Sequence, residues 1–130
     1  MKKRVLLGMA ALLLSVSLLM AQEIPAGVIT AFKRGSSQEL SKYMGDKVNL
    51  VLQGNSTNVD KKKATAMMQE FFTENKVNGF DVNHQGKRDE SSFVIGTLTT
   101  TKGNFRVNCF LKKVQDKCLI HQIRIDKINE

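Results

Sequence analysis

The second half of the chain alternates between apolar and polar residues with a period of two. Strict alternation favours β-strands that bury one face, and short polar connections between such strands favour hairpins. The alternating segments are residues 80–84, 94–101, 105–112 and 118–128. We therefore predict four consecutive strands joined by three antiparallel hairpins.

The first half of the chain carries helical signals. A helix is predicted between Pro25 and Gly35, which favour a helix start and a helix stop. A second, short helix follows, because Ser36 and Glu39 have the spacing of a capping box. The alternation in residues 46–54 then predicts a strand.

The strongest amphipathic signal begins at Asp60, a good N-cap residue. The apolar residues that follow fall at positions i, i+3, i+4, i+7 and i+8 of a helix, and they are Ala64, Met67, Met68, Phe71 and Phe72. The expected order is therefore helix, helix, strand, long helix and four strands. This pattern belongs to the α+β fold class.

The N-terminal residues 1–21 have the pattern of a secretory signal peptide, with cationic residues before an apolar run that ends at Ala21. The run is shorter than the ~20 residues that span a bilayer, so no stable membrane span is expected after cleavage. Residues 22–130 would form a single domain in the periplasm or outside the cell. Losing the signal's three basic residues lowers the formal net charge from +8 to +5. The basic residues are spread along the chain, which disfavours nucleic acid as a partner.

The register of the last two strands decides where the two cysteines point. A three-residue turn at residues 114–116 keeps the apolar side chains on one face. It sets Cys109 opposite His121 and turns Cys118 to the other face, so no disulfide is expected between the cysteines. A tight turn at Lys102 and Gly103 is predicted between the strands of residues 94–101 and 105–112. Gly96 in mid-strand would permit a bend or a bulge, so that the sheet curls around the long helix.

A contact between Cys109 and His121 has two interpretations. It could activate a thiolate for nucleophilic chemistry, or the thiol could simply pack beside a core histidine. We favour core packing, because no Asn or Asp on that strand face would orient the histidine. The two cysteines and two histidines lack metal-ligand spacing, so neither a metal nor a cofactor is expected.

The two faces of the predicted sheet suggest two kinds of site. Candidates for lining an inner pocket, which would take a small apolar ligand, are His84, Cys109 and His121 from the strands with Met68 and Phe72 from the long helix. The outer face would carry an apolar patch of Phe93, Ile95, Phe110 and Ile120. An open face rarely carries such a patch without a function. We therefore expect a homodimer through the outer sheet face.

Three stretches, "AFKRGSSQELSKYM", "IGTLTTTKGNFRV" and "CLIHQIRI", resemble a family of small exported bacterial proteins, domain of unknown function 4783. The resemblance implies a nuclear-transport-factor-2-like cone of the cystatin-like group, with helices packed in the concavity of a curved antiparallel sheet. It also implies a secreted or periplasmic location, and it implies no activity.

Two functions are compatible with the sequence. We expect an exported, non-catalytic binding or interaction module, because no carboxylate has the inward parity that a general base in the cone would need. The alternative is a small-molecule pocket enzyme of the isomerase or dehydratase type, which the superfamily also contains.

Overall fold

The computed structural model of the chain describes residues 24–128. The predicted signal peptide, residues 1–21, lies outside the described residues. Within them the elements are α2 (Ala26–Arg34), α3 (Ser37–Ser41), β1 (Met44–Leu52), β2 (Asn55–Asp60), α4 (Lys61–Glu74), β3 (Val77–Arg88), β4 (Ser91–Thr100), β5 (Gly103–Val114) and β6 (Lys117–Lys127). The α+β class is confirmed. None of the helices in this part of the chain is long and apolar enough to cross a membrane.

The strands form one six-stranded sheet in the order β2-β1-β6-β5-β4-β3. The three predicted hairpins that join β3 to β6 are confirmed. The prediction of a purely antiparallel sheet was wrong, because β1 pairs with β6 in parallel. The predicted order also lacked β2, a polar edge strand that is exposed along nearly its whole length and has no apolar alternation to reveal it.

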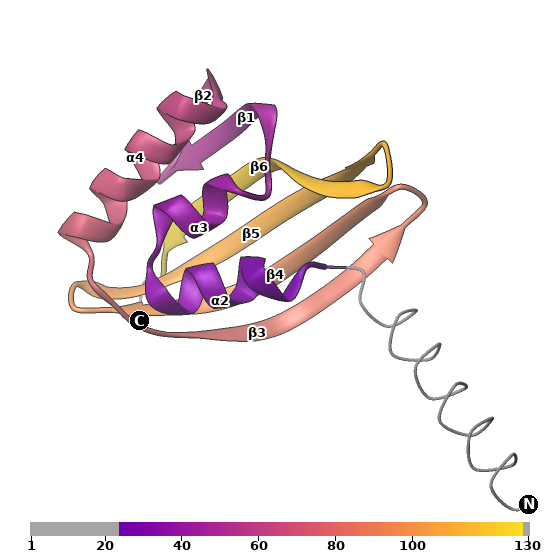
Figure 1. The fold of residues 1–130 in the computed structure, drawn as a ribbon. Helices are drawn as coiled ribbons and strands as arrows, with labels where there is room; N and C mark the ends of the chain where they lie inside the picture. Colours follow the sequence, from indigo (N-terminus) through magenta and orange to yellow (C-terminus); the bar gives the residue numbers. More distant parts are fainter. Residues whose placement is uncertain (1–23, 129–130) are drawn as a thin grey trace, which may run out of the picture.

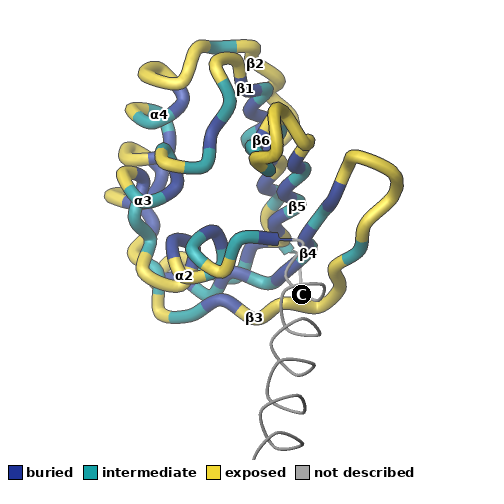
Figure 2. Tube along the Cα trace, turned by 45° about the vertical axis from the view of Figure 1, so that its right-hand side comes forward, coloured by how far each residue is buried: buried dark blue, intermediate teal, exposed yellow. Residues whose placement is uncertain are grey.

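The sheet is curved, and the three helices lie on its concave side (Figure 1). Aromatic contacts join the helical layer to the sheet. The rings of Phe32 in α2 and Phe80 in β3 are 5.1 Å apart between centroids, and those of Phe71 in α4 and Phe105 in β5 are 5.2 Å apart. The buried residues lie mostly where helices and sheet face each other (Figure 2), as the predicted cone requires.

The helix ends follow the predicted local chemistry. The Ser36 hydroxyl oxygen accepts a hydrogen bond from the Glu39 backbone N–H at 3.2 Å, and an Asp60 carboxylate oxygen accepts one from the Lys63 N–H at 2.8 Å. Gly35 ends α2 in the left-handed conformation, with φ of 62°, which glycine adopts without strain.

Gly96 fills the role predicted for it. A Cβ atom there would lie 2.5 Å from Cζ of Phe80, whose ring occupies the space. The β3–β4 register shifts between Val82 and His84, beside Gly96. The missing side chain thus admits both an aromatic ring and a bulge at the same place in the sheet.

The β5–β6 hairpin differs from the prediction. Its turn has two residues, Gln115 and Asp116, both with positive φ. A register shift follows in β6, where Phe110 faces Gln122 and Leu111 faces Ile120. His121 is therefore the extra residue of a β-bulge.

The β4–β5 turn is also displaced from the predicted position. Thr100 pairs with Gly103, so that Thr101 and Lys102 form the turn. The predicted partners were therefore wrong by two residues along β5. Because the side-chain period of a strand is two, the displacement left every residue on the predicted face.

Candidate functional site

The concave side of the sheet contains three of the five predicted pocket residues. Met68 and Cys109 are fully buried, Phe72 is 7% exposed, and all three belong to the hydrophobic core. Burial raises the pKa of the Cys109 thiol. The thiol therefore stays protonated at neutral pH, which makes it a poor nucleophile.

The two histidines were wrongly assigned to the inner pocket, because both are exposed. His121 sits at the bulge, so Cys109 faces Ile123 instead. Partial burial, and then the positive charge of Lys112, lower the pKa of His121. His84 lies on the convex side of the sheet, where its ring centroid is 5.4 Å from that of Phe93.

The two cysteines are not joined in a disulfide, as predicted, but for a different reason. Cys118 packs against the core from the same sheet face as Cys109, so the prediction of opposite faces was wrong. Cys118 pairs with Lys113, four residues along β5 from Cys109. At about 3.3 Å per residue this separates the two thiols by roughly 13 Å along the strand, far beyond disulfide reach.

The convex face carries an apolar cluster in the middle of the sheet, which we call the convex patch: Phe93, Ile95 and Phe110. All three are half-buried, and Phe93 pairs directly with Phe110 across β4 and β5. The Phe93 ring also covers Gly86, where a Cβ atom would lie 2.8 Å from it. Ile120, the fourth predicted member, is fully buried in the core, because the bulge reverses its parity.

Sequence reasoning missed the contribution of β1 to this face. Val51 pairs with Arg124 of β6 and so lies on this face, toward the β2 edge, but it is only 8% exposed. The signal was present, since Val51 alternates with Leu50 and Leu52, but the parallel β1–β6 pairing was needed to place it.

A row of amide side chains borders the convex patch. Nε2 of Gln122 donates to Oδ1 of Asn49 at 2.8 Å. Nδ2 of Asn49 donates to Oγ of Ser56 at 3.0 Å and to Oδ1 of Asn58 at 2.9 Å. The Asn49 amide therefore has a partner for each donor hydrogen and for its oxygen, which fixes this border in place.

Charged side chains flank the convex patch at both ends of the strands. Toward the β3–β4 and β5–β6 turns lie Arg88 and Lys112, each a cross-strand partner of Ser91. Toward the opposite end lie Asp81, Arg106 and Asp126.

Opposite charges meet across β5 and β6 at this end. Arg106 of β5 pairs with Asp126 of β6. Nε of Arg124 donates to Oδ2 of Asp126 at 2.8 Å. A shallow depression of about 190 Å³ beside this pair is lined by Arg106, Asp126, Lys127 and Ile128.

No three His, Cys, Asp or Glu side chains within residues 24–128 are grouped so that they could hold a metal ion. The chemistry offered on the convex side is therefore apolar contact in the middle, hydrogen bonding along one border and charge at both strand ends.

Comparison with solved structures defines the class of protein first. The fold is nuclear-transport-factor-2-like and cystatin-like. A protein of unknown function from Silicibacter pomeroyi, described as NTF-2 like, matches with a TM-score of 0.61 at 11% identity over 88% of this chain and 98% of its own. A cystatin-like domain from Nostoc punctiforme matches with a TM-score of 0.63 at 12% identity over 81% of this chain and 73% of its own.

The family follows from closer matches. The chain belongs to the DUF4783 family, a domain of unknown function, whose model matches residues 25–126. A DUF4783 family protein from Bacteroides ovatus, known from its crystal structure, is 89% identical, with a TM-score of 0.82 over 84% of this chain and 99% of its own. No curated protein matches significantly.

Proposed function

We propose that this chain is an exported, non-catalytic interaction module that docks a protein partner on the convex face of its sheet. The observation that carries the proposal is the convex patch. Two aromatic side chains and an isoleucine lie together at the centre of a sheet face that no helix within residues 24–128 covers. Apolar clusters of this kind mark interaction surfaces, and aromatic residues are enriched at such surfaces.

The flanking groups support a docking role. A polar rim around an apolar centre is the usual anatomy of a protein interface, and here amides and charges border the patch. Export is supported by the signal-peptide pattern of residues 1–21. The single domain of residues 22–130 is part of the same proposal.

The alternative, a small-molecule pocket enzyme, has less support. The pocket candidates Met68, Phe72 and Cys109 are packed into the core. The carboxylates Asp81 and Asp126 lie on the convex face by register, away from the interior where a general base would act.

Site-specific photocrosslinking tests the docking face. A benzoylphenylalanine at Phe110 keeps the aromatic shape and samples what touches the convex patch. The matched control carries it at Gln69, an exposed position of α4 on the helical side. We expect a discrete adduct, with the cross-linked peptides identified by mass spectrometry, from Phe110 and not from Gln69. Equal or absent adducts at the two positions would contradict the proposal.

A further inference from the structure

We propose that the convex face binds a second copy of this chain about a two-fold axis. The axis runs across the strands and passes between Phe93 and Ile95 of β4. This pairing sets Arg88 of each copy opposite Asp81 of the other. The inference rests on the proposed docking function and names its partner.

The register divides the convex face into four rows that cross the strands. The cationic row holds Arg88 and Lys112. The Phe93 row contains Phe93, Phe110 and Gln122. The Ile95 row contains His84, Ile95, Asn108 and Arg124. The acidic row holds Asp81, Arg106 and Asp126. The apolar surface thus lies in the central rows, and the outer rows are charged, with Arg124 as the one charged side chain among the residues named in the central rows.

Symmetry allows two simple ways to pack this face on a copy of itself. A two-fold axis along the strands would set each row against the same row of the other copy. Arg88 and Lys112 would then meet the same two cations, and like charges across an interface cost several kcal/mol.

An axis across the strands reverses the order of the rows instead. The cationic row then faces the acidic row at both ends of the interface. A two-fold interface uses every contact twice, so the favourable contact of Arg88 with Asp81 is doubled, and so is the unfavourable approach of Lys112 to Arg106.

The axis position follows from residue spacing. On β4, the cross-strand partner of Arg88 and Lys112 is Ser91, and that of Asp81 and Arg106 is Thr97. Ser91 and Thr97 lie equally far from Val94. Val94 points into the core, so the axis passes over it. Phe93 then meets Ile95 of the second copy, and Ile95 meets Phe93. On β5 the same axis sets Phe110 opposite Asn108 of the second copy, so the apolar contact is centred on β4.

Arg88 and Asp81 are the best matched charges. Both lie on β3, and both are exposed. Among residues 24–128 neither forms an ion pair within the chain. Asp126 differs, because Arg124 already binds it. Lys112 would face Arg106 of the second copy, so its favourable contact is with the neighbouring Asp126 or solvent.

The curvature of the sheet fits the same distribution. Two convex faces touch at the middle and diverge toward their edges. Short apolar contacts suit the middle, whereas the long side chains of arginine and lysine suit the widening gap. Four strands at about 4.8 Å spacing and four rows over roughly 20 Å make a small contact area. Weak interfaces of this size dissociate readily, so we expect a dimer that forms in the micromolar range.

Reciprocal charge reversal tests the inference. Arg88→Glu sets a glutamate against Asp81 in its own dimer, and Asp81→Arg sets an arginine against Arg88. Each variant alone should dimerise at least about tenfold more weakly than the unmodified mature protein in sedimentation velocity, because like charges meet twice. A one-to-one mixture should restore dimers, since both charge pairs are then opposite in sign. Native mass spectrometry should identify these dimers as mixed.

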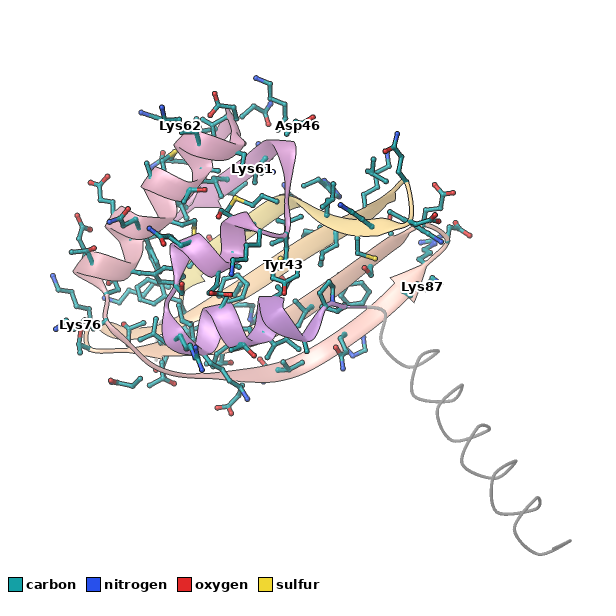
Figure 3. All side chains as sticks on the ribbon, in the orientation of Figure 1. Tyr43, Asp46, Lys61, Lys62, Lys76 and Lys87 are labelled. Atoms are coloured by element: carbon teal, nitrogen blue, oxygen red, sulfur yellow. The ribbon has the colours of Figure 1, made fainter. Side chains whose placement is uncertain are left out.

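Lys62→Glu and Asp46→Arg are the matched controls. They reverse the same charges away from the convex patch, where both side chains are exposed at the β2 end of the molecule (Figure 3). Neither should change the dissociation constant by more than about threefold. Circular dichroism of all four variants checks that the fold is retained.

The outcomes of these experiments distinguish this inference from the docking function on which it rests. A mature protein that stays monomeric at high micromolar concentration overturns the second copy as partner. A heterologous cross-link at Phe110 would in that case still support docking. Dimers that are insensitive to both reversals, or a mixture that fails to recover, overturn the proposed axis. Loss of the Phe110 adduct itself would remove the docking function and the inference together.

Discussion

His121 occupies the extra position of the β6 bulge and thereby decides the orientation of its neighbours. The bulge turns Ile120 into the core and leaves His121 exposed. A histidine tolerates this position because its ring can stay in contact with water. The bulge itself was not predictable, because Gln115 and Asp116 are not the glycine-rich pair that usually signals a two-residue turn with positive φ. A three-residue turn was the simpler way to keep the apolar side chains together.

The pKa of His121 can be followed by NMR. Partial burial, and then the positive charge of Lys112, disfavour the imidazolium form. Lys112→Gln should therefore move the His121 pKa upward, toward the ordinary value of about 6.5. Some lowering should remain, since burial is the larger cause. Lys117→Gln, in the same hairpin, is the control and should leave the pKa unchanged. An unchanged pKa in Lys112→Gln would contradict the assigned cause.

The lowered pKa also fixes the direction of a pH effect. The unfolded chain binds a proton at His121 more readily than the folded chain does. The contribution of His121 to stability is therefore complete above about pH 6.5 and is lost as the pH falls through the folded pKa. His121→Gln should remove this acid-side loss. The change should stay within the ~0.5 kcal/mol typical of exposed positions.

At the scale of elements, prediction succeeded where the signal is local. The N-caps Ser36 and Asp60 and the C-cap Gly35 act through residues three or four positions away, so their pattern is visible in the sequence. Prediction failed where an element depends on its neighbours. β2 has almost no buried side chain, and it is a strand because β1 supplies its hydrogen-bonding partner.

The Asp60 cap gives a prediction for α4. Its carboxylate accepts a hydrogen bond from the Lys63 N–H, and no other acidic residue lies in the first turn. Asp60→Ala should lower the free energy of unfolding by about 1 kcal/mol. Asp60→Asn keeps the acceptor and should recover most of the loss. Urea denaturation measures both. An alanine variant as stable as the asparagine variant would mean that the cap contributes nothing.

On the scale of the whole molecule, the parallel contact between β1 and β6 joins two halves that are distant in sequence. The β3–β6 meander could form from hairpins alone, whereas β1 and β2 are held to it by this contact. The overall fold could be predicted from the sequence because of the family resemblance. The side chains of the docking face could be placed only from the strand register of the structure. A two-residue error in a turn, or one bulge, changes which side chains meet there.

Leu50 lies at this junction. It is fully buried and pairs with Ile123 of β6. Leu50→Ala should lower the free energy of unfolding by about 2–5 kcal/mol, since it removes core contacts and leaves a cavity. Val114→Ala is the control. Val114 is 46% exposed at the end of β5, so its truncation should change stability by less than about 0.5 kcal/mol.

Two optical probes can then establish whether the halves unfold together. The sequence contains one tyrosine and no tryptophan, so tyrosine emission reports on Tyr43 alone. Its side chain packs against Gly27 of α2 at the start of β1 (Figure 3). Far-ultraviolet circular dichroism reports on the whole sheet. Coincident transitions by both probes are expected for the unmodified protein and for Leu50→Ala, because β1 is an integral part of the core. A separate, earlier Tyr43 transition would show that β1 and the helices detach while the meander stays folded.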